Sequence, residues 1–246
     1  MPKPEGLQFD WRCKQRLLQP EWMDQPAVGQ GELAQAIVGL QRLNRLGFAA
    51  QLLASACDAN RFSPANPPAR ILDVACGNGG ELRALHHYYR RQPECVGADV
   101  NTEFIAQGEL ISSTGIRFVQ ADVIAPGALT KLGQFDLITC SLFLHHLAEN
   151  QIITLLRNLK AQCRGRIVIS DLHRSALAWF GIGIASRVVT RSPIVHCDAL
   201  LSVQAGFTIP EFQALLFKAG LERAELNAKF PFRLLATWDE QKPQEH

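Results

Sequence analysis

Histidines follow two apolar segments of the chain that read as buried strands. His145 and His146 come after residues 135–143, and His173 comes after residues 165–171. A histidine changes its charge near neutral pH, so it can take a proton from a hydroxyl group as a general base. Ligands of open α/β sheets bind outside the carboxyl ends of the strands, where these histidines would meet. We therefore expect a catalytic histidine, His146 first and His173 second.

Three further residues near these positions could take part in chemistry. His196 and Asp198 lie close together in the sequence, so Asp198 could orient His196. Arg174 could bind a substrate carboxylate, although a solvent-facing arginine is the more usual outcome. Each histidine alone could equally be a hydrogen-bonded core residue, and only the cluster favours chemistry. Their spacing is not that of a metal site, so we expect no metal.

A glycine-rich turn stands in the first third of the chain. Residues 71–80 read ILDVACGNGG, an apolar segment with an acid, then the turn. Gly77 and Gly79 allow a sharp turn and a close approach to a ligand, and a helix is expected from Glu81. This arrangement is typical of a site for a nucleotide-like cofactor. Leu82 replaces the third glycine of a dinucleotide fingerprint, which disfavours an NAD-type oxidoreductase.

Two carboxylates follow the next expected strands. Asp99 lies 22 positions after Gly77, close to the spacing of about 20 at which nucleotide-binding α/β units place an acid against ribose hydroxyls. Asp99 could also cap the helix expected from Thr102, as could Asn101. Asp122 follows the strand expected at residues 116–120; taken alone, it would be a turn residue or a helix cap.

Strands and helices alternate through the centre of the chain. After the first strand, strands are expected at 94–100, 116–120, 135–143 and 165–171, and helices at 81–91, 102–113 and 150–163. Such alternation predicts an α/β fold, a mostly parallel sheet with helices on both faces. The C-terminal part should add a helix at 210–219 and strands at 221–228 and 232–238.

Two flanking regions depart from this alternation. Residues 1–60 are interpreted as an N-terminal helical extension, with helical spacing over 32–57, that either covers the core or acts as a lid. Residues 61–246 would form the main domain, and residues 172–205 a helical insertion that covers the substrate. Alternatively, a helix of this insertion contacts a membrane surface, with Arg187 and Arg191 facing head groups.

Composition limits the classes of partner. The 246 residues carry a net charge of +2 without a run of like charges, so we expect a small-molecule partner and no nucleic acid. The seven cysteines lack metal-binding spacing and are interpreted as reduced thiols of a cytoplasmic protein. No apolar run reaches the length of about 18 to 20 residues that a membrane span needs, so no stable insertion is expected. The oligomeric state stays open.

The glycine turn with Asp73, the acids Asp99 and Asp122, and the segment 135–147 together resemble the class I S-adenosylmethionine-dependent methyltransferases. This resemblance implies a Rossmann-like, seven-stranded sheet whose last hairpin is antiparallel, with S-adenosylmethionine as the cofactor. It also implies that Asp122 accepts a hydrogen bond from the adenine amino group. The implied cofactor-binding residues are Asp73, Ala75, Gly77, Gly79, Asp99, Val100, Asp122, Val123 and Cys140.

Two short segments suggest the acceptor. Residues 171–174 (DLHR) and 20–24 (PEWMD) resemble bacterial methyltransferases of lipid or aromatic polyketide pathways, which belong to secondary metabolism. The expected function is methyl transfer to a small hydrophobic acceptor, at the hydroxyl of a phenolic, polyketide or lipid-like compound. Two alternatives stay open: a catalytically silent scaffold with the methyltransferase fold, and the disfavoured NAD-type oxidoreductase.

Overall fold

A single seven-stranded sheet organises the computed structural model, which describes residues 7–240 apart from 26–27, 47–48, 59–60 and 113. The strand order is β3-β2-β1-β4-β5-β7-β6, with β7 antiparallel to both of its neighbours and the other pairs parallel. The predicted α/β fold, with its antiparallel last hairpin, is confirmed. The strands are β1 (Arg70–Val74), β2 (Glu94–Asp99), β3 (Ile116–Gln120), β4 (Phe135–Ser141), β5 (Cys163–Leu172), β6 (Glu225–Lys229) and β7 (Arg233–Asp239).

Helices cover both faces of the sheet because residues of the buried strands alternate between two cores. Leu72 and Val74 of β1 pack in one core with residues of α5 and α8, whereas Ile71 packs in the other with residues of α2 and α3. These helices are α2 (Ala49–Asp58), α3 (Gly80–Tyr88), α5 (Glu149–Gln162) and α8 (Ile209–Lys218). A further helix, α4 (Thr102–Ile111), contacts β2 and β3 at the edge of the sheet.

The largest error in predicted boundaries concerns the penultimate strand. It was expected to begin at residue 221, but β6 begins at Glu225. Leu221 instead closes the end of α8: its backbone N–H donates to the carbonyl of Leu216, and its own carbonyl accepts from Ala224. Leu221 is fully buried, so its apolar character reflects core packing against α8 and not a strand.

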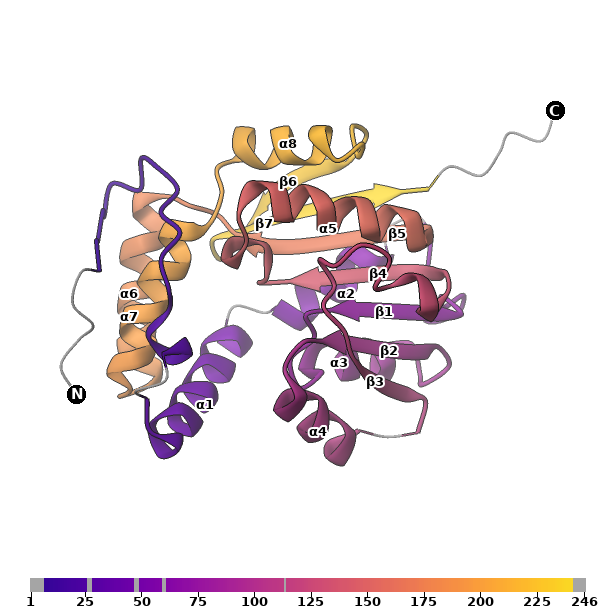
Figure 1. Ribbon diagram of the computed structural model, residues 1–246, viewed down its shortest axis with the longest axis horizontal. Helices are drawn as coiled ribbons and strands as arrows, with labels where there is room; N and C mark the ends of the chain where they lie inside the picture. Colours follow the sequence, from indigo (N-terminus) through magenta and orange to yellow (C-terminus); the bar gives the residue numbers. More distant parts are fainter. Residues whose placement is uncertain (1–6, 26–27, 47–48, 59–60, 113, 241–246) are drawn as a thin grey trace.

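Helices α1 (Gln30–Leu46), α6 (Ala176–Val189) and α7 (Pro193–Ala205) lie beyond the carboxyl ends of the parallel strands (Figure 1). The short helix η1 (Trp22–Asp24) packs on α7, so the two flanking regions meet there. By contrast, α2 packs in the central core beneath β1. The domain boundary near residue 60 stays a prediction.

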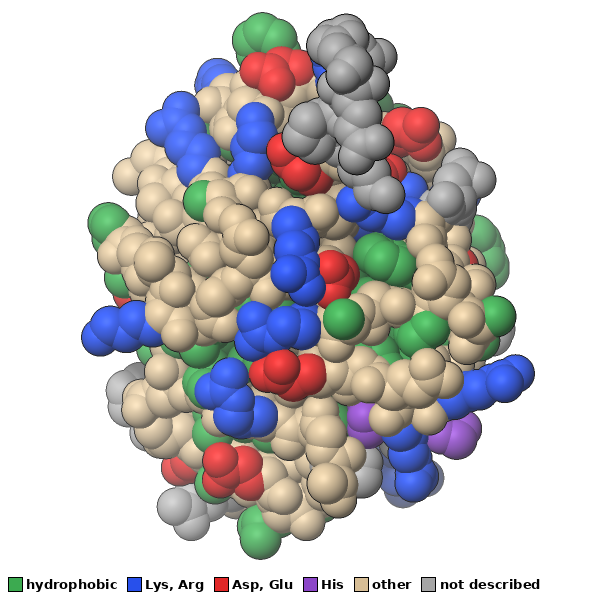
Figure 2. Space-filling model, turned by 90° about the vertical axis from the view of Figure 1, so that its right-hand side faces the viewer, with side chains coloured by type: hydrophobic (Ala, Val, Ile, Leu, Met, Phe, Trp, Pro, Cys, Tyr) green, Lys and Arg blue, Asp and Glu red, His purple; other side chains and the backbone are tan. Residues whose placement is uncertain are grey.

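Ion pairs hold the opposite end of the sheet. Arg70 at the start of β1 pairs with Glu94 of β2 at 2.9 Å, and Arg164 of β5 pairs with Asp136 of β4 at 2.8 Å. Figure 2 shows this face, where basic and acidic side chains are interspersed. Among the residues that the structure describes, no helix is long and apolar enough to cross a membrane.

Candidate active site

A cavity of about 1380 Å³ opens at the carboxyl ends of the strands, between the sheet and helices α1, α6 and α7. Its floor consists of the turns that follow β1 to β4. Its roof is mainly apolar and includes Ile37 and Leu40 of α1, Ile182 and Ala185 of α6, and Ile194 and Ala199 of α7. One cavity therefore joins a polar floor to an apolar roof.

The two glycines of the first turn have different surroundings. A Cβ atom built on Gly77 would meet nothing within 4 Å, and the residue lines the cavity with a φ of 54°. A Cβ atom on Gly79 would lie 2.5 Å from the ring of Phe118, so this glycine is required by packing. Ala75 lines the cavity with a φ of 53°, a conformation that costs an L residue about 1 kcal/mol or more. Of these two glycines, Gly77 is the one that leaves the backbone open to a ligand.

Asp99 lies against this turn and lines the cavity. Its carboxylate accepts hydrogen bonds from the backbone N–H of Gly77 at 2.8 Å and of Asn101 at 2.9 Å. The N-cap of α4 is Asn101, whose side chain accepts from the N–H groups of Glu103 and Phe104. The alternative that Asp99 is the helix cap is therefore wrong, and its carboxylate positions the glycine turn.

Three more of the predicted cofactor residues line the same cavity: Val100, Asp122 and Val123. Asp122 is exposed, and its carboxylate accepts from the N–H of Ile124 at 3.1 Å. It therefore holds the turn after β3 while it faces the cavity, so the turn role and the ligand role are compatible.

Two predicted cofactor residues, Asp73 and Cys140, lie behind the cavity wall. Cys140 is fully buried in the core, because alternation along β4 turns its side chain away from the cavity, whose lining begins at Ser141. Asp73 accepts from Thr139 Oγ1 at 2.7 Å, and burial raises the pKa of its carboxyl to about 8. Its Oδ2 atom is buried without a partner among the described residues. Direct cofactor contact by these two side chains is therefore not supported.

Charged side chains gather next to the turn. Burial raises the pKa of Glu81, which lines the cavity, and the charges of Glu81 and Asp99 add to the effect of burial on Asp73. Arg233 at the start of β7 also lines the cavity, and its buried Nη1 atom has no hydrogen-bond partner within the described ranges. The cavity wall thus offers acidic side chains and a guanidinium with one nitrogen that lacks a partner among the described residues.

A buried carboxylate orients one histidine of the pair. Asp171 Oδ1 lies 2.7 Å from Nδ1 of His145, and its oxygens also accept from the N–H groups of Leu144 and Leu172. The charge of His145 and these hydrogen bonds outweigh burial and lower the pKa of Asp171. An ionised carboxylate only accepts hydrogen bonds, so Nδ1 of His145 is the donor in this contact and Nε2 is the other ring nitrogen.

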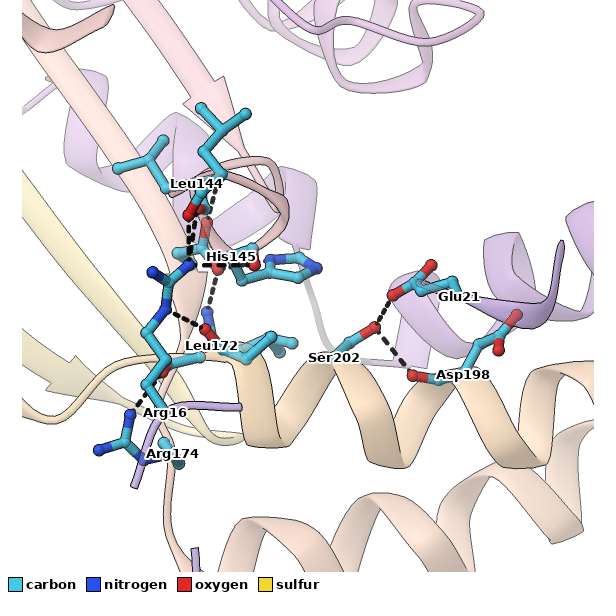
Figure 3. A network of polar contacts seen from close by, with 12 residues as sticks. Arg16, Glu21, Leu144, His145, Leu172, Arg174, Asp198 and Ser202 are labelled. Atoms are coloured by element: carbon cyan, nitrogen blue, oxygen red, sulfur yellow. Dashed lines mark hydrogen bonds and ion pairs between the residues drawn. The ribbon is translucent and has the colours of Figure 1, made fainter. Parts of the chain in front are cut away.

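His146 lies beside His145, with 4.1 Å between the ring centroids, on the short helix η3 (Leu144–His146). Both histidines line the cavity. Desolvation, with a smaller contribution from His145, lowers the pKa of His146 below its ordinary value. Glu21 offers a carboxylate oxygen within 4.8 Å of a ring nitrogen of each histidine and accepts a hydrogen bond from Ser202 (Figure 3).

Two of the predicted residues do not join this cluster. His173 is absent from the cavity lining because β5 runs on to Leu172, and the backbone of His173 donates to the carbonyl of Phe232. The ring of His196 lies 2.8 Å from the carbonyl oxygen of Thr190. The structure thus brings His145 and His146 together and leaves the other two apart.

Asp198 and Arg174 bind backbone groups of the N-terminal segment. The Asp198 carboxylate accepts from the N–H groups of Trp22 and Met23 at 2.7 and 2.9 Å, and so anchors η1. Arg174 is buried and donates to the carbonyls of Cys13 and Gly206 at 3.0 Å, besides its ion pair with Glu211. The interpretations of Asp198 as an orienting residue and of Arg174 as a substrate ligand or solvent-facing residue are therefore not supported.

Arg16 was missed by the sequence analysis. Its guanidinium donates to the carbonyls of Leu144, His145 and Leu147 around η3 and to that of Ala205 at the end of α7 (Figure 3). Carbonyls at helix ends lack partners within the helix, and an arginine is well suited to bind several of them. No local sequence signal distinguishes this residue from other arginines of a polar segment.

Comparisons with known proteins agree with this geometry. Residues 71–166 match the family model described as a methyltransferase domain. The plantazolicin methyltransferase BpumL in complex with SAH has a similar structure, with a TM-score of 0.68, 18% identity, and coverage of 90% of this chain and 93% of that chain. No curated protein sequence matches.

Two further structures share the fold. A putative O-methyltransferase from Nostoc punctiforme PCC 73102 has a TM-score of 0.60, 16% identity, and coverage of 87% of this chain and 64% of that chain. Human N-acetylserotonin methyltransferase in complex with SAM has a TM-score of 0.59, 15% identity, and coverage of 86% and 57%. The predicted resemblance is thus confirmed for the fold, and residues 71–166 match a methyltransferase domain.

The role of Arg16 can be measured through stability. Arg16→Ala should lower the free energy of unfolding by about 2 to 4 kcal/mol, because several carbonyls lose a charged donor. Urea unfolding checks this, with exposed Arg12→Ala as the matched control. Equal stability of the two variants would contradict the anchoring role.

Proposed function

We propose that this chain, whose residues 71–166 form a methyltransferase domain, transfers a methyl group from S-adenosylmethionine to the hydroxyl of a small hydrophobic acceptor. The observation that carries the proposal is that one cavity is lined by both the glycine turn and His145, which the buried Asp171 holds from behind, beneath an apolar roof. Such a site aligns an apolar acceptor and excludes water from it.

The residues of the floor fit the cofactor. Gly77 leaves space for it, Asp99 would accept from the ribose hydroxyls, and Asp122 with Val123 would meet the adenine. When bound, S-adenosylmethionine supplies a methyl group on a positively charged sulfur. The acids around the glycine turn complement that charge.

The methionine end of the cofactor has matching partners in Glu81 and Arg233. This end carries an ammonium and a carboxylate, and the two side chains supply the opposite charges on the cavity wall. The Nη1 atom of Arg233, which is buried without a partner among the described residues, would gain a carboxylate.

We assign the base to His145. Its Nε2 would take the hydroxyl proton while the Asp171 carboxylate stabilises the imidazolium that forms. Among the described residues, His146 has no carboxylate partner comparable to Asp171, and its lowered pKa makes it a weaker base that would contact the acceptor as a neutral ring. The roof residues of α1, α6 and α7 would hold the apolar body of a phenolic or polyketide-like compound.

Activity measurements distinguish the roles of His145 and His146. His145→Gln should lower kcat by about 100-fold or more near neutral pH without changing the affinity for S-adenosylhomocysteine, and His146→Gln should have a smaller effect. A phenolic acceptor ionises on its own at a pH near 10, so the rate of His145→Gln should recover there. An unchanged pH profile for His145→Gln would overturn the assignment, and binding of S-adenosylhomocysteine without turnover in a broad acceptor screen would favour a silent scaffold.

Gly77 and Gly79 provide a matched pair of variants, one for cofactor binding and one for stability. Gly77→Ala should weaken binding of S-adenosylhomocysteine by about tenfold or more, with a loss of stability of only about 1 kcal/mol from its positive φ. Gly79→Ala should lower stability by about 1 to 3 kcal/mol through the contact with Phe118. Calorimetry and urea unfolding measure the two effects. If Gly77→Ala binds S-adenosylhomocysteine as tightly as the unmodified protein does, the cofactor does not bind at this turn.

Binding of the cofactor should release a proton from Asp73. With a pKa of about 8, this carboxyl is mostly protonated near pH 7, and a nearby cation favours its ionised form. The affinity should therefore rise as the pH rises towards 8 and then level off. Calorimetry of S-adenosylmethionine binding in buffers of different ionisation enthalpy detects the proton, which Asp73→Asn should abolish and exposed Glu222→Gln should not.

A further inference from the structure

Helix α6 is apolar on two of its faces. Its inner face lines the cavity with Gly181, Ile182 and Ala185. Its outer face exposes a stripe of large apolar side chains, called the α6 stripe: Leu177, Phe180, Ile184 and Val188, with exposed fractions of 73, 49, 66 and 80%. At about 100° per residue these four lie within an arc of about 80°. An apolar stripe of this kind is expected to be covered by a partner.

An aromatic residue extends the α6 stripe. Trp11 is 48% exposed, and its ring centroid lies 5.9 Å from that of Phe180. The guanidinium of Arg12 lies over the Trp11 ring at 5.3 Å from its centroid. Tryptophan and arginine together are typical of surfaces that meet lipid head groups.

The charges around the stripe have one predominant sign. Arg187 on α6, Arg191 just beyond its end, and Arg12 and Lys14 of the N-terminal segment are all exposed. No acidic residue occurs between positions 172 and 197. Asp10 is the acid next to Arg12, and its carboxylate accepts from the Arg12 backbone N–H.

The basic residues around the α6 stripe argue against a second copy of the chain as the partner. In a two-fold dimer the same surface meets itself, which would bring the basic side chains of the two copies together. An anionic lipid surface instead attracts them and takes up the apolar side chains.

We propose that the α6 stripe and Trp11 dock this protein on the surface of an anionic lipid bilayer without crossing it. Another face of the same helix forms part of the roof of the cavity, so docking brings that part of the roof next to the lipid. The docking surface is independent of the methyl transfer, and its test needs no activity.

The test is co-sedimentation of the full chain with vesicles of phosphatidylcholine alone or with one-third phosphatidylglycerol. The protein should bind the anionic vesicles at least about tenfold more tightly, and the difference should shrink as salt rises. Failure to bind the anionic vesicles overturns the proposal.

Variants locate the surface. Ile184→Ser with Val188→Ser should weaken vesicle binding by about tenfold or more, whereas Leu110→Ser with Phe217→Ser, at similarly exposed positions of α4 and α8, should not. Arg187→Gln should weaken binding to anionic vesicles only. Equal vesicle binding by the two double variants overturns the proposal. It is also overturned if the protein does not bind vesicles and light scattering shows a dimer that Ile184→Ser with Val188→Ser dissociates.

Discussion

The carboxylate of Asp171 fixes the geometry on which the active site depends. It is fully buried at the end of β5, yet it accepts from two backbone N–H groups and from His145. A buried charge is tolerated only when such donors compensate for its lost hydration. The same hydrogen bonds tie η3 to β5, so the orientation of His145 and the path of the chain after β4 are set by one group.

At the glycine turn, by contrast, hydrogen-bond donors do not compensate for the burial of the carboxyl group of Asp73. Asp73 is buried, lies near the charges of Glu81 and Asp99, and has one neutral donor, Thr139, so its ionised form is disfavoured. Holding like charges together lowers stability in the absence of a ligand. A cationic ligand would relieve this repulsion, as the proposed function expects of a positively charged sulfur.

The sequence predicted those features that depend on local patterns. The apolar segments with an acid at or after the end placed Asp99 and Asp122 at the cavity, because parallel strands bring their carboxyl ends together. Asp171 and His145 lie 26 positions apart, and the Arg16 contacts to η3 span more than 125 positions. Such pairings follow from the register of β4 on β5 and the path of the N-terminal segment, which no local pattern encodes.

The N-terminal segment and His145 are mechanically connected. Asp198 of α7 holds η1 through two backbone hydrogen bonds, and Arg16 binds both the end of α7 and the carbonyls around His145. Glu21 lies between these anchors, next to the two histidine rings. A displacement of the segment would therefore shift the roof at α7 and the loop that carries His145 together. The position of the cavity roof and the placement of His145 are for this reason one structural property, built from the two regions that flank the alternating strands and helices.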